Sequence, residues 1–329
     1  KKKFRNILSN NLVYASLFFW LFLLIISIFA ENKYLSYKDS LIFIRILIIP
    51  IFLYYWILTD EILIYKLIKI IFFTILFVSI DTLFQYSNYN PEYGFGKDIF
   101  GFTSDFYGRL TGPFYKELVP GAYVSKFALI GLIYLLICFK NKQKFKHITI
   151  ILYLSLVGVV CYVSGERMAL ATFLLALFFL ILLFKKYRIN FLISFISIIL
   201  ISIILNKTHP IYNDYKILES SPLHLGLKIE KKIKCDDELD NCNKIIKLQP
   251  SFIQIIKNFD KSAYGEIYNL GLKMWKDHPF QGIGLNNFNY LCKNDKRYSS
   301  IIINYSCTSH PHNFYLQWLV ETGPVGLIL

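Results

Sequence analysis

Long apolar blocks alternate with short hydrophilic links along most of the chain. A helix needs roughly 20 predominantly apolar residues to cross a bilayer, and eight blocks approach that length. They lie at about 11–30, 40–58, 62–83, 119–139, 148–164, 168–184, 189–205 and 313–329. The pattern predicts an all-α, polytopic membrane protein, because a membrane β-barrel shows weaker, alternating segments of about ten residues.

The composition favours the same class. Hydrophobic residues make up 55% of the 329 residues, above the range of about 45–50% that is usual for soluble domains. The net charge of +14 does not indicate a nucleic-acid partner, because much of it lies in three short links. These links hold Lys1, Lys2, Lys3 and Arg5; Lys140, Lys142, Lys144 and Lys146; and Lys185, Lys186 and Arg188. Positive charge of this kind marks the cytoplasmic face.

Counting spans from a cytoplasmic amino end gives the domain organisation. Residues 1–205 would form seven transmembrane helices, with the hydrophilic link ENKYLSYKD and the link at 84–118 outside. Residues 206–312 would form a periplasmic cap, and 313–329 the start of a further transmembrane helix. The chain begins KKKFRN and ends within an apolar run, so we expect it to be a fragment that lacks helices at one or both ends.

Two features of the cap suggest local structure. Ile267, Leu270 and Met274 are spaced for one face of a helix that ends before the glycines of QGIGLNN. That face could pack the cap or guide substrate. Four cysteines also lie in the cap, where an oxidising compartment would permit disulfides. Three pairings are possible, and we favour Cys235 with Cys242 and Cys292 with Cys307 over a zinc site, because CxxC spacing is absent.

Charged residues within spans are costly and often functional. Five of them fall in the outer halves of the predicted spans or at their outer ends. They are Arg45, Asp81, Lys126, Arg167 and Glu321. Lys126 and Arg45 could equally snorkel to lipid headgroups, whereas the short SGERM turn would hold Arg167 at one depth.

Fixed cations and imidazoles at one water–lipid boundary suit a lipid-linked phosphate. Arg109 and Glu117 lie in GRLTGPFYKELVPGAY, before the fourth span, and Arg109, Arg167 and Lys126 could bind phosphate oxygens. His310 or His312 could accept a proton from a hydroxyl at neutral pH, with activity falling below about pH 6. Ser309 is the expected N-cap of the last helix, and Pro311 fits its first turn. We invoke no metal ion.

One run is specific enough to suggest a family. The sequence CTSHPHNFYLQWLVETGPVGLIL resembles the signature of the O-antigen ligase and polymerase superfamily, the Wzy and WaaL proteins, in which a histidine–asparagine pair opens a helix that continues to E-T-G-x-x-G. The stretches GRLTGPFYKELVPGAY, SGERMALATF and MWKDHPFQGIGLNNFNYLC fit the same pattern in order.

The resemblance implies a GT-C-like, metal-independent, inverting glycosyltransferase of the bacterial inner membrane, with its active site facing the periplasm. It would need no cofactor and would move a glycan from undecaprenyl diphosphate to an acceptor hydroxyl. The acceptor would be lipid A–core for a ligase or a second lipid-linked glycan for a polymerase, and a chain-length regulator could be a partner. Arg167 would bind diphosphate and His312 would activate the acceptor. His310 would assist, and Asn313 and Glu321 of the same signature would contact substrate.

The chain departs from the family pattern at one place. Many members carry an arginine in the cap where this chain has Tyr264, Gly265 and Glu266. Either another cation, Arg109 or Lys273, supplies that charge, or this subgroup handles the diphosphate differently. A transporter of a polysaccharide or a lipid-linked precursor is the main alternative, although the charges cluster outward and no internal repeat is visible. A scaffold that only holds the cap is the third.

Overall fold

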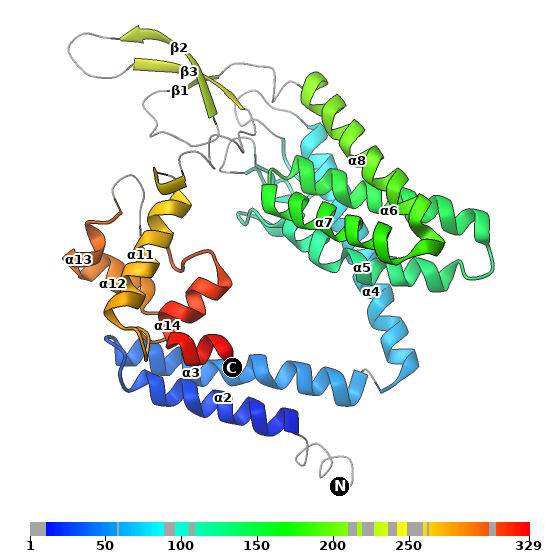
Figure 1. Cartoon of the computed structure of the whole chain (residues 1–329). Helices are drawn as coiled ribbons and strands as arrows, with labels where there is room; N and C mark the ends of the chain where they lie inside the picture. The colour runs from blue at the N-terminus through cyan, green and yellow to red at the C-terminus, as the bar shows by residue number, and fades with distance from the viewer. Residues whose placement is uncertain are drawn as a thin grey trace. The chain divides into compact units, whose positions relative to one another are not determined.

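The computed structural model describes residues 11–57, 59–88, 96–104, 109–209, 216–218, 227–235, 242–248, 259–261, 263–302 and 307–329. These residues are helical apart from one small sheet (Figure 1). The chain divides into two compact units. Among the described residues, the first unit contains the helices before residue 60 and those after residue 259. The second contains the helices between them and the sheet.

Each of the eight apolar blocks forms a helix. The helices are α2 (Asn11–Ser27), α3 (Lys33–Phe52), α4 (Glu61–Ser87), α5 (Pro120–Cys138), α6 (Gln143–Val163), α7 (Arg167–Leu183), α8 (Arg188–Thr208) and α14 (Phe314–Ile328). Within the described part of the chain, four helical segments are long and apolar enough to cross a membrane: α4, α5, α6 and Lys185–Thr208. α2 and α7 are shorter apolar helices. The protein is therefore a multi-pass helical membrane protein, as predicted.

Short elements connect these helices. They are a π-helical turn η1 (Leu53–Ile57), the 3₁₀ turns η2 (Gly112–Phe114), η3 (Lys185–Tyr187) and η4 (Phe259–Lys261), and the helices α11 (Ala263–Asp277), α12 (Phe288–Asn294) and α13 (Lys296–Ser299). The helix expected from Tyr264 to Asp277 is confirmed as α11. Its apolar positions Ile267, Leu270 and Met274 are buried, so that face packs the core of the first unit.

In the second unit, α4 to α8 pack around one apolar core. Small residues let the helices approach one another closely. Gly131 of α5 leaves room for the ring of Tyr153, whose hydroxyl donates a hydrogen bond to the Ala128 carbonyl (3.0 Å). Gly158 of α6 similarly accommodates Ile198 of α8. These contacts fix the helices that carry the candidate cations.

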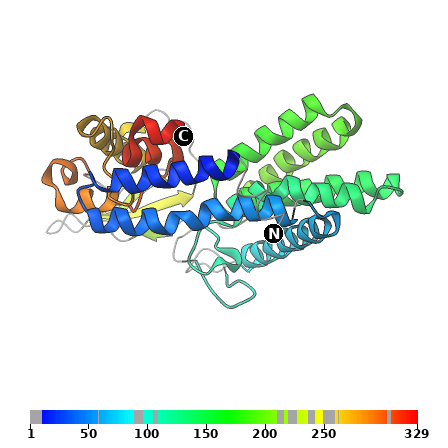
Figure 2. The ribbon, with the colours of Figure 1, turned by 90° about the horizontal axis from the view of Figure 1, so that it is seen from below.

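In the first unit, α2 and α3 form an antiparallel pair that lies side by side in both views (Figures 1 and 2). Ser27 bonds to Ser40 (2.8 Å) and accepts from Ser36 (2.9 Å), all three buried. The prediction that ENKYLSYKD is a link is wrong, because α3 already begins at Lys33. The Asn32 side chain caps it by accepting from the Leu35 N–H (3.1 Å), and the serine bonds hold these polar turns against α2.

A kink in α14 joins two motifs of the sequence. Gly323 leaves the helical region (φ 69°, ψ −175°), and Pro324 has no N–H, so the carbonyls one turn earlier lose their helical partners. The loop QGIGLNN replaces them: Ile283 N donates to Val320 O and Gly284 N to Glu321 O, both at 2.9 Å. Gly282 and Gly284 have positive φ, and a Cβ on Gly282 would overlap the α14 backbone.

A three-stranded antiparallel sheet is an addition to the predicted all-α fold. It contains β1 (Lys216–Leu218), β2 (Leu227–Cys235) and β3 (Cys242–Leu248), in the order β1-β3-β2. The backbone register places Cys235 opposite Cys242. A disulfide between these two cysteines stays a prediction, as does the division of the chain by membrane position.

The fully buried Asn287 anchors the QGIGLNN loop to the turn between α2 and α3. Its Oδ1 accepts from the Asn32 N–H (2.8 Å), and its Nδ2 donates to the Asn32 and Leu285 carbonyls (3.4 and 3.0 Å).

Asn287→Ala would leave these buried groups unpaired and should cost about 1–3 kcal/mol of stability. Thermal unfolding in detergent measures this. Asn294→Ala, at an exposed position of α12, is the control; equal midpoints for the two variants would contradict the anchoring role.

Candidate functional site

The candidate histidines His310 and His312 of the first unit lie directly before α14, not within it. Asn313 is the N-cap, with its Oδ1 accepting from the Leu316 N–H (3.0 Å). The expectation that Ser309 caps this helix, with Pro311 in its first turn, is therefore wrong. His312 has a left-handed backbone conformation (φ 56°), which breaks any helix that would start earlier.

Aromatic rings surround the His312 side chain. The Tyr264 ring of α11 meets it edge to face (6.0 Å between centroids), and the His310 ring lies 4.4 Å away. His310 in turn bonds to the Ser309 hydroxyl through Nδ1 (2.8 Å), and its carbonyl accepts from Thr308 (2.9 Å). The His312 side chain is still exposed enough to meet a substrate.

The surroundings of the His312 imidazole favour its neutral form. Partial burial lowers the pKa of His312 from its ordinary value, and the nearby positive charge that His310 can carry lowers it further. A neutral imidazole at physiological pH can accept a proton. The segment therefore presents an accessible base on a fixed backbone.

The remaining signature residues have structural contacts. Asn313 uses its oxygen for the cap and its Nδ2 to reach the Tyr268 hydroxyl (3.5 Å). Glu321 is buried, and its carboxylate accepts from the Asn286 N–H (3.2 Å) and the Gln317 amide (3.4 Å). Burial favours a packing role for Glu321, whereas Asn313 lies next to the candidate base.

In the second unit, Arg167 is the first residue of α7, directly after the SGE turn. The segment that carries Arg109 is docked onto that turn, because Leu110 is fully buried and its N–H donates to the Ser164 carbonyl (3.4 Å). Gln85 of α4 holds the next residues by accepting from Thr111 and Gly112 (3.1 and 2.9 Å). Two arginines are thus carried by segments that pack together.

Sequence reasoning gave Glu166 no role. Its carboxylate accepts from the N–H groups of Gly121 (2.7 Å) and Ala122 (3.0 Å), in the first turn of α5. Burial raises the pKa of Glu166, while these two hydrogen bonds and the charges of Arg109 and Lys126 lower it. Its position directly before a helix start was the available signal, since acidic residues favour helix N-termini.

The other predicted cations and carboxylates differ in their surroundings. Buried Arg109 Nε has no hydrogen-bond partner in the part of the chain that the structure describes, which leaves a donor available to a ligand. Lys126 and Glu117 are exposed. Arg109 and Lys126 both lie close enough to Glu166 for their charges to lower its pKa, and Arg167 is the next residue in the chain.

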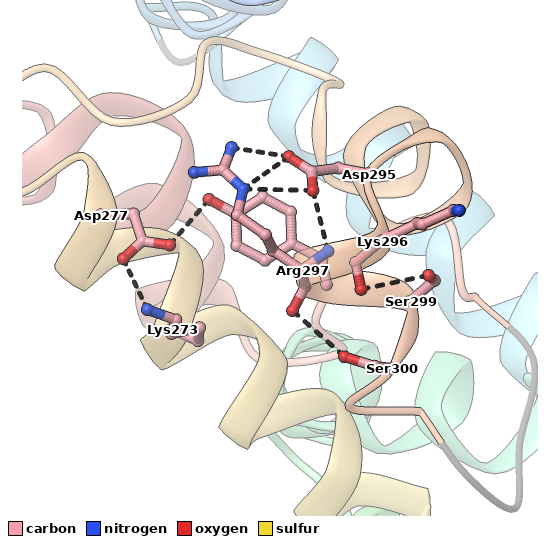
Figure 3. A network of polar contacts seen from close by, with 8 residues as sticks. Lys273, Asp277, Asp295, Lys296, Arg297, Ser299 and Ser300 are labelled. Atoms are coloured by element: carbon pink, nitrogen blue, oxygen red, sulfur yellow. Dashed lines mark hydrogen bonds and ion pairs between the residues drawn. The ribbon is translucent and has the colours of Figure 1, made fainter.

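Lys273 is the other cation considered as a substitute for the family arginine. It belongs to a polar network at the carboxyl end of α11 (Figure 3). Its ammonium pairs with Asp277 (2.8 Å), which also accepts from the hydroxyl of buried Tyr298 (3.0 Å). Arg297 lies over the Tyr298 ring and pairs with Asp295 through a guanidinium–carboxylate bridge. The network ties α11 to α13, which indicates that Lys273 supports the cap.

The chain was compared with models of known protein families. The model described as O-antigen ligase matches residues 150–329. The chain belongs to the O-antigen ligase family. It is therefore an enzyme that transfers glycans, of the O-antigen ligase or polymerase type, and its substrates are lipid-linked glycans. Comparison with curated proteins and comparison with solved structures each found no significant match.

The matched range has a consequence for the candidate residues. It contains Arg167, His310 and His312 but begins after Arg109, Glu117 and Lys126. The evidence for a role of this earlier segment is therefore its packing against the SGER turn, not the family match.

A disulfide between Cys292 and Cys307 closes the segment before the histidines. The two cysteines are 15 positions apart, and a loop of that size corresponds to about 3 kcal/mol in a chain-entropy treatment. Replacing both with serine, or reducing the wild type, should lower the unfolding midpoint. Intact mass after alkylation without reduction reports the bond. Cys138→Ser, at a free and exposed cysteine, should change nothing; alkylation of both Cys292 and Cys307 in the unreduced protein would contradict the assignment.

Proposed function

We propose that this enzyme moves a glycan from undecaprenyl diphosphate to an acceptor hydroxyl in one displacement that inverts the anomeric centre. The acceptor oxygen bonds to the anomeric carbon as the bond from that carbon to the diphosphate oxygen breaks. The proton of the hydroxyl goes to a base, and the electron pair leaves with the diphosphate. Two kinds of protein group are needed: a proton acceptor and fixed positive charge.

His312 is the proposed base. It is accessible and follows a segment restrained by the Cys292–Cys307 disulfide, and its lowered pKa favours the neutral form that can accept a proton. His310 lies against it and sets part of its electrostatic surroundings. Asn313 fixes the start of α14 directly behind it.

Arg167 is the proposed diphosphate ligand, with Arg109 and Lys126 as supporting cations. A guanidinium binds phosphate oxygens in a bidentate manner and stays charged at any relevant pH. It can therefore hold the donor and stabilise the charge that develops on the leaving diphosphate. The free Nε of Arg109 within the described residues supports its role as a second donor group.

The proposed setting is the outer face of the bacterial inner membrane. Residues 206–312 would form the periplasmic cap, and lipid A–core or a second lipid-linked glycan would be the acceptor, with a possible chain-length regulator as partner. The observation that carries the proposal is the exposed, ring-flanked His312 at the start of α14, within the range matched by the family. Purified protein with a defined lipid-diphosphate donor, scored for polymer against capped core, tests the transfer and separates polymerase from ligase.

Loss of either proposed group should abolish most of the transfer. We expect His312→Ala and Arg167→Ala each to lower kcat by at least about 100-fold, in line with typical losses of a general base or an electrostatic stabiliser. Arg167→Lys should rescue only partly, because lysine cannot bind in a bidentate manner. The readout is the surface polysaccharide ladder together with in vitro transfer, after membrane insertion is verified. An unchanged ladder in both alanine variants would favour a transporter or scaffold.

The pH dependence of transfer should follow His312. Because its pKa lies below the ordinary value near 6.5, activity should persist to a pH below 6.5 before it falls on the acid side. His310→Gln removes the neighbouring positive charge, so the pKa of His312 should rise and the acid limb should move to higher pH. Rate profiles from pH 5 to 8 measure the acid limb of the wild type and that of His310→Gln. A flat profile, or a limb that moves to lower pH in His310→Gln, would argue against His312 as the base.

A further inference from the structure

A buried joint in the second unit connects the SGER turn to the start of α5. Glu166 accepts from two separate backbone N–H groups with its two oxygens, Gly121 at 2.7 Å and Ala122 at 3.0 Å. Both N–H groups belong to the first turn of a helix, where they have no helical acceptor and carry the positive end of the helix dipole. The carboxylate therefore satisfies two donors that would otherwise need water.

The joint is closely packed as well as hydrogen-bonded. A Cβ on Gly121 would overlap the Ser164 hydroxyl and press against Glu166 Oε1. Cys161 of α6 approaches the Gly121 carbonyl through its sulfur (3.5 Å). The backbone of α5 can thus approach the turn only because residue 121 lacks a side chain.

Charged and titratable groups lie near Glu166 on the neighbouring elements. Arg109 before η2 and Lys126 on α5 are close enough for their charges to lower its pKa, Cys161 is the titratable group on α6, and Arg167 is the next residue in the chain. Cations gathered at one place repel one another, and a carboxylate near them reduces that cost. Glu166 therefore offsets this repulsion at the point where the backbone of Arg167 is fixed.

We propose that Glu166 is a positioning residue for donor binding: its carboxylate, clamped on the α5 N-terminus, holds Arg167, Arg109 and Lys126 in register for a diphosphate. The inference rests on the function proposed above. Glu166 does not touch the reacting atoms. It acts through the cations, so its loss affects the donor and leaves the acceptor and the base unaffected.

The hydrogen-bonding capacity and charge of the side chain at position 166 predict which substitutions impair donor binding. Glutamine keeps the length of the side chain but presents one acceptor and one NH₂ group, so it cannot accept from both N–H groups and carries no charge. Glu166→Gln should raise the donor KM by roughly tenfold or more, the loss expected for a hydrogen bond to a charged group. The acceptor KM should change by less than about twofold, because the His312 segment is untouched.

The experiment is steady-state transfer by the full chain in detergent, with a lipid-diphosphate donor varied at fixed acceptor and then the reverse. Gly121→Ala perturbs the same joint from the other side without changing any charge, so it should produce the same donor-selective rise. Glu61→Gln, an exposed carboxylate at the start of α4, is the matched control and should behave as wild type. Thermal unfolding identifies variants that retain the fold.

The pH dependence of the donor KM gives a second readout. Because burial raises the pKa of Glu166, mild acid should protonate it and raise the wild-type donor KM, whereas Glu166→Gln should lack this component. Wild-type donor KM in folded Glu166→Gln, or equal losses for donor and acceptor in both joint variants, would overturn the positioning role. If Arg167→Ala also transfers normally, the proposed function fails instead, so the two failures are distinguishable.

Discussion

Buried backbone groups that a kink releases from helical hydrogen bonds must find partners within the protein, since an unpaired buried carbonyl is costly. The Gly323–Pro324 kink frees the carbonyls of Val320 and Glu321, and the N–H groups of Ile283 and Gly284 satisfy them. Without this exchange the bend in α14 would leave these buried carbonyls unpaired, and the QGIGLNN loop would lose its attachment to α14. The ETG and QGIGLNN motifs of the sequence are therefore two halves of one joint.

This joint also explains how the histidine segment acquires a fixed position. The QGIGLNN loop attaches to α14 by backbone bonds and to the α2–α3 turn through Asn287. α11 precedes the loop and contributes Tyr264, whose ring meets His312. Tyr264 is one of the three residues found where many family members carry an arginine, and it brings a ring rather than a charge to the surroundings of His312.

The sequence predicted the large features because their signal is periodic and strong. Runs of about 20 apolar residues gave every long helix, and spacing at Ile267, Leu270 and Met274 gave α11. It failed where a polar side chain decides the local structure. The polar residues of ENKYLSYKD indicate a link in the sequence, whereas in the structure Ser36 bonds to Ser27 of α2 and the segment is helical. Asn313 rather than Ser309 caps α14, because the positive φ of His312 prevents the helix from starting earlier. The sheet was missed, although KIEKKIKC partly alternates polar and apolar residues.

The role of Glu166 could not be read from the sequence for a different reason. An acidic residue beside an arginine usually indicates a local ion pair or a solvated turn, and its partners are backbone groups 44 and 45 positions away. Backbone N–H groups carry no sequence signature of their own; only Gly121, which permits the close approach, leaves a trace. A site that binds a diphosphate gathers cations, and gathered cations repel one another before the substrate arrives. A carboxylate can offset that repulsion and still stay in place when its two oxygens each accept a hydrogen bond from a backbone N–H, as those of Glu166 do at the start of α5.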